Sequence, residues 1–203
     1  LFTKIVRITI AVTFIIGTIL GPVPYSASAQ EPLPWRDDFN GLLAEDWDWL
    51  NENSAKWNLT ENPGSLRIYT SPYATGGENL LLRHVDQNDF TIETRVLFTP
   101  DTNFQFAGLV IWQDAANFLQ LGRAYCYLEE SPCVDNGIYF DHVIGGAFTG
   151  SSFATVVGNP SEIYLRLVHR GNYAFAYYST DGTAWTFMGG HATPEGFTVN
   201  AMA

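Results

Sequence analysis

The sequence predicts an all-β fold in which two antiparallel sheets stack as a sandwich. Aromatic residues make up 15% of the chain, with fourteen Phe, ten Tyr and six Trp against two Met, and this composition favours strands over helices. Short apolar segments recur between turn signals, and several of them alternate apolar and polar residues. Beyond the first thirty residues, no stretch sustains a helical period for three turns. Many short strands packed in a sandwich are therefore expected.

Residues 90–98 give the clearest single strand. Phe90, Ile92, Thr94, Val96 and Phe98 occupy alternate positions and therefore share one face. The same alternation at 163–168 predicts a second half-buried strand, and the apolar run at 106–112 predicts a strand between two sheets. Further strands are expected at 66–69, 79–83, 118–123, 138–143 and 153–157. The last two are expected to be short strands among longer loops, because the section from 125 to 158 is rich in glycine.

Residues 173–187 are predicted to form a β-hairpin. Two aromatic-rich runs flank the segment Ser179-Thr180-Asp181-Gly182, and Asp-Gly is a strong turn dipeptide. We expect this segment to be a structural turn, with Trp185 packed in the core.

The first thirty residues predict export. Lys4 and Arg7 precede an almost unbroken apolar stretch at 8–20, and Ala27-Ser28-Ala29 fits the small-residue rule for signal peptidase. The stretch is shorter than the roughly 20 residues that a transmembrane helix needs. We therefore expect a signal peptide at 1–29, a leader at 30–36 and one sandwich domain at 37–203. The mature protein would be secreted or extracytoplasmic, with no membrane association after cleavage. An uncleaved N-terminal anchor is the alternative.

The charge distribution argues against nucleic acid as a partner. The formal net charge is −11, and no run of Lys or Arg could follow a phosphate backbone. The acidic residues are scattered, which is typical of a solvated surface.

Cys126 and Cys133 are the two cysteines of the chain. In an exported protein, an even and closely spaced pair indicates a disulfide. Closing so short a loop stabilises the fold by roughly 2–3 kcal/mol. Two free thiols are the alternative, whereas a metal site is not expected because no further His or Cys lies at ligand spacing.

A series of short motifs resembles a known carbohydrate-active family. The motifs are Asp37-Asp38-Phe39, Trp47, Trp49, Trp57, Pro63-Gly64-Ser65-Leu66, Asn79-Leu80-Leu81-Leu82, Asp89-Phe90-Thr91-Ile92, Gln105-Phe106-Ala107-Gly108-Leu109-Val110, Asn117-Phe118-Leu119-Gln120-Leu121 and Ser179 through Trp185. Their order and spacing resemble the concanavalin A-like module at the C-terminus of β-xylosidases and arabinofuranosidases of glycoside hydrolase family 43. The resemblance implies a two-sheet jelly roll with an accessory role, because catalysis in those enzymes belongs to a separate propeller domain. It also implies a last strand near 197–203, so a domain truncated at its C-terminal end is an open alternative.

The sequence shows no recognisable catalytic motif. A glycosidase needs two carboxylates about 5–10 Å apart. Catalytic relatives of this fold place theirs in a Glu-x-Asp-x-x-Glu string, which does not occur in this sequence. Glu45-Asp46-Trp47-Asp48 and Glu129-Glu130 come nearest, and both are expected to be surface charge. Gly-x-Ser-x-Gly does not occur either, and the four histidines lack His-x-x-x-His spacing.

A sugar-binding face combines an aromatic ring, which stacks on the C–H face of the sugar, with planar polar side chains for its hydroxyls. Trp112 ends an apolar strand and is the expected stacking platform. The other candidate ligand-binding residues lie on neighbouring segments and are Gln105, Gln120, Arg123, Tyr125 and Arg83. Alternatively, Trp112 belongs to the core and Arg83 pairs with nearby acids.

A structural calcium ion is the one cofactor that this fold class suggests. Sandwiches of this kind often hold Ca²⁺ between the first and last strands through carboxylates and backbone carbonyls. Asp37 and Asp38 are the candidate ligands, although their spacing does not require a metal.

These observations favour a secreted, non-catalytic carbohydrate-binding or glycosidase-accessory module. Its expected partners are a plant-type or other polysaccharide or oligosaccharide, and a catalytic domain in a longer parent protein. Two alternatives stay open. One is a glycoside hydrolase whose carboxylates, such as Glu129 or Asp141, converge from distant positions. The other is a laminin-G-like extracellular interaction domain with a protein partner.

Overall fold

The computed structural model describes residues 35–69, 77–85, 89–127, 133–148, 153–193 and 201–202. The chain divides into two units, Leu1–Arg36 and Asp37–Ala203. The predicted signal peptide lies outside the described residues, as do most of the leader and Glu129. Within the described ranges, no helix is long and apolar enough to cross a membrane. The second unit contains the strands and is described below.

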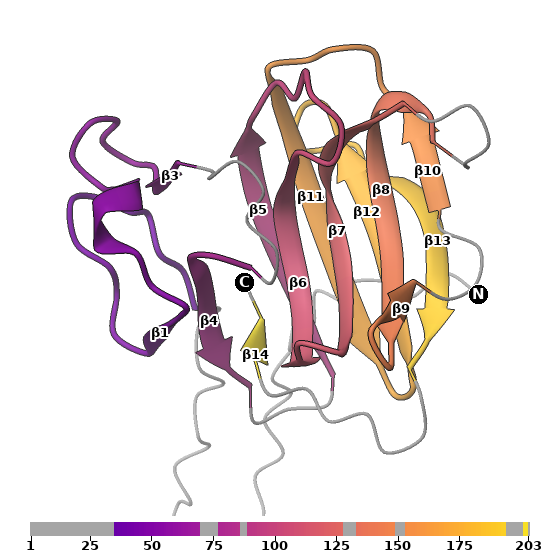
Figure 1. Cartoon of the computed structure of the whole chain (residues 1–203), viewed down its shortest axis with the longest axis horizontal. Coiled ribbons are helices and arrows are strands. Elements are labelled where there is room, and N and C mark those ends of the chain that lie inside the picture. The colour runs from indigo at the N-terminus through magenta and orange to yellow at the C-terminus, as the bar shows by residue number, and fades with distance from the viewer. Residues whose placement is uncertain are drawn as a thin grey trace, which may run out of the picture. The chain divides into compact units, whose positions relative to one another are not determined.

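Two antiparallel sheets dominate this unit, which confirms the predicted sandwich. The larger sheet has eight strands in the order β1-β4-β14-β6-β7-β8-β10, with β9 paired to β8. The strands are β1 (Trp47–Leu50), β4 (Leu80–His84), β6 (Phe106–Asp114), β7 (Asn117–Cys126), β8 (Asp135–Ile144), β9 (Ala147–Phe148), β10 (Phe153–Val156) and β14 (Ala201–Met202). In Figure 1, its central strands β6, β7 and β8 lie in front of the other sheet.

The smaller sheet has four strands in the order β13-β12-β11-β5. They are β5 (Phe90–Leu97), β11 (Glu162–Arg170), β12 (Tyr173–Ser179) and β13 (Thr186–Ala192). The predicted hairpin is the β12–β13 pair. In its turn, the Asp181 carboxylate accepts the backbone N–H groups of Thr183 and Ala184 at 2.7 and 2.8 Å. The segment is therefore a structural turn, as predicted.

The hydrophobic core lies between the two sheets. Alternation along each strand turns the large apolar residues of both sheets toward one another. Leu119 and Leu121 of β7 and Leu165 and Leu167 of β11 are completely buried. Full burial of each such side chain contributes about 1.5–3 kcal/mol. The other buried members of this cluster are Phe90, Leu109, Ile111, Ile138, Phe140, Ile163, Ala174 and Ala176.

The strands with the cleanest alternation in the sequence are confirmed, but the prediction for the middle section is wrong in one respect. β5 and β11 lie where the alternation placed them. β8 is not a short strand between loops, since it has ten residues, as many as β7. Gly137 lies inside β8, where a Cβ atom would come within 2.7 Å of Val134 and 2.9 Å of the Thr155 carbonyl. This glycine therefore allows close packing and does not mark a loop.

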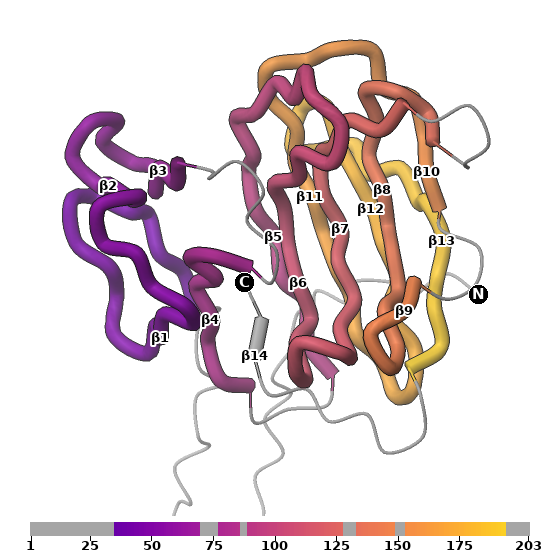
Figure 2. The backbone as a smooth tube through the Cα atoms, in the orientation of Figure 1, coloured from indigo at the N-terminus to yellow at the C-terminus, as the bar shows by residue number. Residues whose placement is uncertain are grey.

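Residues 37–69 form a small extension beside β4 (Figure 2). After β1, the 3₁₀ turn η1 (Ser54–Lys56) leads into β2 (Trp57–Asn58), which pairs with β3 (Arg67–Ile68). Trp49 and Trp57 stack with their ring centroids 5.0 Å apart. These two rings hold β1 and β2 together.

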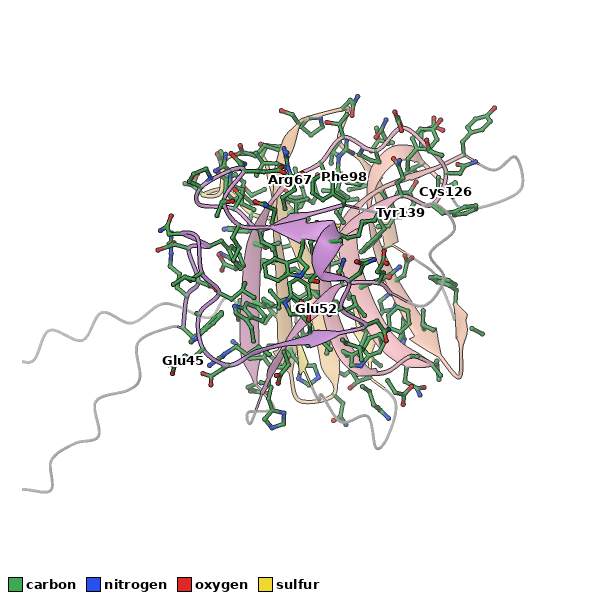
Figure 3. The ribbon with its side chains drawn as sticks, turned by 60° about the vertical axis from the view of Figure 1, so that its left-hand side comes forward. Glu45, Glu52, Arg67, Phe98, Cys126 and Tyr139 are labelled. Atoms are coloured by element: carbon green, nitrogen blue, oxygen red, sulfur yellow. A yellow bond between two sulfur atoms is a disulfide. The ribbon has the colours of Figure 1, made fainter. Side chains whose placement is uncertain are left out.

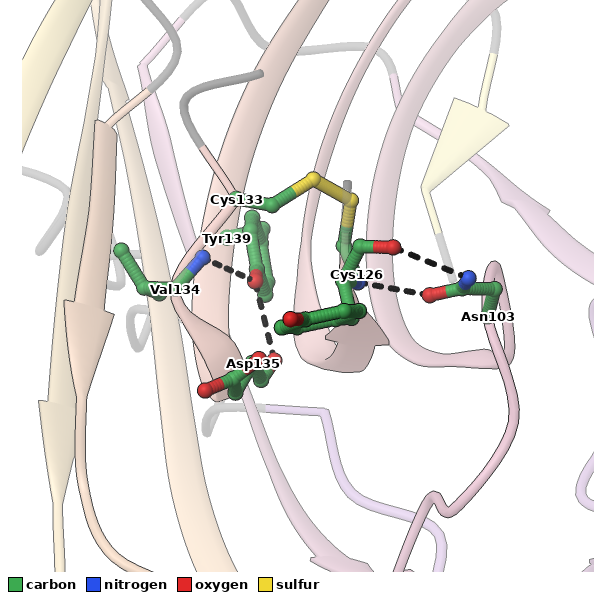
Figure 4. The surroundings of a disulfide bond; sticks show 7 residues. Asn103, Cys126, Cys133, Val134, Asp135 and Tyr139 are labelled. Carbon is green, nitrogen blue, oxygen red and sulfur yellow. Dashed lines mark hydrogen bonds between the residues drawn. A yellow bond between two sulfur atoms is a disulfide. The ribbon is translucent and has the colours of Figure 1, made fainter. Parts of the chain in front are cut away.

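The predicted disulfide is present between Cys126, at the end of β7, and Cys133, just before β8 (Figure 4). Beside it, the Tyr139 hydroxyl accepts the Val134 N–H at 2.8 Å and donates to the Asp135 carbonyl at 2.9 Å. These contacts fix the start of β8 next to the disulfide.

Trp185 lies on the outer face of the smaller sheet, so its predicted place in the core is wrong. The Arg166 guanidinium carbon lies 3.7 Å from the centroid of the Trp185 ring. Arg166 alternates with buried Leu165 and Leu167 along β11, so it projects away from the core. The cation–π contact gives this ring a partner outside the core.

Candidate functional site

The outer face of the eight-stranded sheet carries a pair of aromatic rings. Trp112 of β6 lies directly opposite Phe118 of β7. Their rings stack with centroids 5.5 Å apart and planes inclined by 25°. Both side chains are half-buried and pack against the buried pair Leu82 and Val110. The two rings therefore form a supported aromatic surface that is still partly accessible.

A polar pair lies next to the aromatic pair on the same face. Gln120 follows Phe118 by two residues and so shares its face. Asp141 of β8 lies opposite Gln120, whose amide donates a hydrogen bond to the Asp141 carboxylate at 3.2 Å. Asp141 is 9% exposed. A carboxylate offers about four acceptor positions, so this one bond leaves the pair with capacity for further hydrogen bonds.

Toward the disulfide, the face continues through Gly122 and Tyr139. Gly122 lies opposite Tyr139, and a Cβ atom on Gly122 would come within 2.4 Å of the Phe106 ring. The glycine therefore lets this ring lie against the sheet. Tyr139 is buried, which raises the pKa of its hydroxyl, and it lies near Cys126 (Figure 3).

Two of the six predicted ligand-binding residues, Trp112 and Gln120, share this outer face. Arg123 faces the core instead, because it lies an odd number of positions from Gln120. Its side chain is completely buried, and burial lowers the pKa of its guanidinium. The Nη2 atom donates to the Asn159 side-chain oxygen at 2.9 Å. Arg123 is therefore a core residue and reaches no surface where a ligand could bind.

Arg83, Gln105 and Tyr125 also lie apart from the aromatic pair. Arg83 faces the opposite side of the sheet from Leu82 and forms a 3.8 Å ion pair with Asp46. The Gln105 side chain accepts the Asp101 N–H at 2.8 Å within its own loop. Tyr125 donates its backbone N–H to the Gln105 carbonyl at 3.2 Å. The structure therefore gathers only part of the predicted set.

Phe118 and Asp141 belong to the face but were not among the predicted ligand-binding residues, since Asp141 was named only as a carboxylate of the alternative hydrolase. Alternation along 138–143 could have indicated Asp141, since it falls between Phe140 and His142 and must face away from both. No local pattern pairs it with Gln120, because that pairing depends on the register between β7 and β8.

Asp37 organises the loop before β1. Its Oδ1 atom accepts the Phe39 N–H at 2.7 Å, while Oδ2 accepts the Ala44 N–H at 2.8 Å and the Trp47 indole N–H at 2.9 Å. Both oxygens thus face N–H donors, which does not suit a calcium ligand. The part of the chain that the structure describes holds no group of three or more His, Cys, Asp or Glu side chains able to bind a metal. The surroundings of Asp37 therefore do not suit the calcium ion that the fold class suggested, while a calcium-binding role for Asp38 stays a prediction.

Several surface carboxylates have a lowered pKa. The hydrogen bond from Tyr69 is the main cause at Glu61, and the one from Arg95 is the main cause at Glu162. Backbone N–H groups hold the pKa of Asp181 far below its usual range. A glycosidase needs a general acid with a raised pKa, so these three side chains are unsuited to that role.

Comparison with known proteins fits this architecture. Residues 36–197 match the family described as the beta xylosidase C-terminal concanavalin A-like domain. The chain belongs to this family. The resemblance seen in the sequence and the predicted jelly-roll fold are thereby confirmed.

The relatives of this β-xylosidase C-terminal domain are larger proteins. A xylan 1,3-beta-xylosidase of a Vibrio species is 25% identical over 186 residues, which cover 82% of this chain and 34% of that protein. The glycoside hydrolase family 43 protein BlXynB of Bacillus licheniformis shares the fold with a TM-score of 0.66, at 24% identity over 76% of this chain and 30% of that chain. A xylan beta-1,4-xylosidase of Bacillus halodurans has a TM-score of 0.62, at 19% identity over 81% and 33%. The chain thus spans about a third of the length of these relatives.

Proposed function

We propose that this domain is a non-catalytic, carbohydrate-binding accessory module of a glycoside hydrolase that acts on xylan. The observation that carries the proposal is the juxtaposition, on one sheet face, of the Trp112–Phe118 ring pair and the Gln120–Asp141 hydrogen-bonded pair. Rings supply the stacking surface for a sugar, and an adjacent amide and carboxylate supply hydrogen bonds to its hydroxyls. The ligand would be a short stretch of xylan chain.

The carboxylates support the non-catalytic part of the proposal. Among the described residues, Asp141 is the one carboxylate that is buried, and its side chain is engaged by Gln120. Glu61, Glu162 and Asp181 have lowered pKa values, whereas glycoside hydrolysis needs a proton donor. We assign catalysis to another domain of a longer parent protein, as the lengths of the relatives suggest.

Export is the second part of the proposal, and it rests on residues 1–29. The basic, apolar and small-residue regions of this segment are those of a signal peptide. N-terminal sequencing of the protein recovered from the culture medium or periplasm should begin at Gln30. Recovery of the protein with residues 1–29 still attached in the cytoplasm would contradict export.

Isothermal titration with β-1,3- and β-1,4-linked xylo-oligosaccharides tests the binding role. Replacing a central aromatic anchor typically costs more than 1 kcal/mol, so Trp112→Ala should weaken binding by about tenfold. Trp112→Phe keeps a ring and should retain most of the affinity, while Gln120→Ala should weaken binding several-fold. Circular dichroism of each variant controls for folding. A folded wild-type protein that binds none of these sugars would refute the proposal.

A further inference from the structure

Over residues 173–177, strand β12 has an inverted distribution of side-chain size, whereas the following Tyr178 packs against the core cluster. Ala174 and Ala176 face the core and are completely buried. Tyr173, Phe175 and Tyr177 alternate with them and therefore lie on the outer face of the four-stranded sheet. A strand selected only for stability would turn its large apolar residues inward, since burial of a large side chain contributes about 1.5–3 kcal/mol. The placement of three aromatic rings on the solvent side therefore calls for another explanation.

The neighbouring strand extends this surface. Phe187 of β13 lies directly opposite Tyr177, with ring centroids 5.3 Å apart. Tyr173 and Phe175 stack with centroids 6.0 Å apart and planes inclined by only 16°, and Phe175 lies 6.5 Å from Phe187. We call these four residues, Tyr173, Phe175, Tyr177 and Phe187, the aromatic platform. Contiguous apolar patches of this kind mark binding surfaces more often than single exposed rings do.

Two further features keep the platform flat and accessible. A Cβ atom on Gly190 would come within 2.8 Å of the Phe175 ring, so the glycine lets this ring lie against the sheet. Tyr173 is 51% exposed and Phe187 is 55% exposed. The platform is therefore a broad surface and not a closed cavity.

Two ion pairs and one further cation border the platform. The cation is Arg170, which lies opposite Tyr173 and donates to the Phe90 and His169 carbonyls. Arg166 of β11 lies opposite Tyr177 of β12 and donates a hydrogen bond to the Glu93 carboxylate at 2.7 Å. Further along the same face, Arg95 forms an ion pair with Glu162 at 2.5 Å. Paired charges leave little net field to attract an ionic polymer, and the whole chain carries a net charge of −11, which repels polyanions. A ligand for this surface is therefore expected to be neutral.

We propose that the aromatic platform is a second carbohydrate-binding surface, which takes the flat face of an extended, neutral, β-linked polysaccharide in insoluble form. Outward side chains repeat along a strand about every 6.5–7 Å, so the rings offer several stacking positions in a row to such a chain. The Trp112 site lies on the other sheet and therefore faces away from the platform. The inference rests on the carbohydrate-binding role proposed above. It adds a site that binds the surface of a solid polysaccharide, whereas the Trp112 site binds short soluble chains. Two such contacts on one domain would raise its avidity for the solid polysaccharide.

Depletion binding of the full chain to insoluble xylan and to cellulose tests the proposal. The double variant Tyr173→Ala/Phe187→Ala should weaken binding to one of these solids by about tenfold or more. The matched control is Tyr127→Ala/Phe104→Ala, which removes one exposed Tyr and one exposed Phe elsewhere and should bind as the wild type does. Soluble xylo-oligosaccharide binding should be unchanged in both variants.

The outcomes distinguish this inference from the proposed function. Unchanged binding of the platform variant to both solids, with soluble binding intact in the wild type, overturns the platform alone. A wild-type protein that binds neither the soluble oligosaccharides nor the solids overturns both the proposed function and the platform. A wild type that dimerises in sedimentation velocity while the platform variant is monomeric would show that a second copy of the chain occupies the surface, which also contradicts the inference.

Discussion

His142 of β8 and His191 of β13 face each other between the two sheets, with ring centroids 5.3 Å apart. Both side chains are buried, and the His191 Nε2 atom lies 3.2 Å from the Phe140 carbonyl oxygen. Burial, with a smaller contribution from His191, lowers the pKa of His142 below its usual 6.5. The folded protein therefore holds His142 neutral at pH values where the unfolded chain becomes protonated.

This pair predicts a stability that falls with acidification. Below pH 6.5 the unfolded chain binds a proton that folded His142 does not. The free energy of unfolding should therefore decrease as the pH falls, by at most about 1.4 kcal/mol per pH unit for this group, until His142 titrates in the folded state. Urea unfolding at pH 7.5, 6.5 and 5.5 measures the slope. His142→Phe should reduce it and His84→Gln, at an exposed position, should not; equal slopes in all three proteins would refute the assignment.

Gly108 predicts a steric limit at the centre of the larger sheet. A Cβ atom there would come within 2.1 Å of the Leu121 carbonyl oxygen and 2.5 Å of the Gly122 Cα atom. Gly108→Ala should therefore force β6 and β7 apart and destabilise the fold by about 1–3 kcal/mol or more. Gly145 has open space around it and a φ of +59°, a strained conformation that Gly108 does not adopt, so Gly145→Ala separates the effect of backbone strain from that of a steric clash. A Gly108→Ala protein as stable as the wild type in denaturant titration would contradict the close approach.

The disulfide should stabilise the domain chiefly by restricting the unfolded chain. For a sequence separation of seven residues, the chain-entropy estimate is roughly 2–3 kcal/mol. In chemical unfolding, the free energy of unfolding should fall by about this amount both in the Cys126→Ser/Cys133→Ser protein and in the wild type treated with excess dithiothreitol. A large loss in the variant with none in the reduced wild type would instead point to a packing defect caused by serine.

Asp37 should stabilise the domain through its loop and not through a cation. Asp37→Ala removes the acceptor for three hydrogen bonds, so we expect a loss of about 2–4 kcal/mol in unfolding free energy. The loss should be the same in excess CaCl₂ and in excess EGTA. Asp38→Ala in both conditions completes the test of the calcium hypothesis, and a calcium-dependent shift of the unfolding midpoint in the wild type would support that hypothesis.

The two faces of β7 show which features of the candidate site could be predicted from the sequence. Gln120 and Arg123 lie close together in the sequence, and both residue types suit sugar binding. Their separation of three positions places them on opposite faces, with Arg123 completely buried. This difference could have been read from the alternation itself. That Gln120 lies opposite Asp141 could not be predicted in this way, because their pairing depends on the register between β7 and β8.

The sequence by itself determined the class of fold, the main strands, the pairing of the two cysteines and the family. These features depend on local patterns: a period of two, turn dipeptides and the order of short motifs. The tertiary structure decided which faces the rings occupy, since strands from distant parts of the chain must pair before a face exists. It placed the Arg166 guanidinium over the Trp185 ring, and it turned Tyr173, Phe175 and Tyr177 of β12 outward while Ala174, Ala176 and Tyr178 face the core.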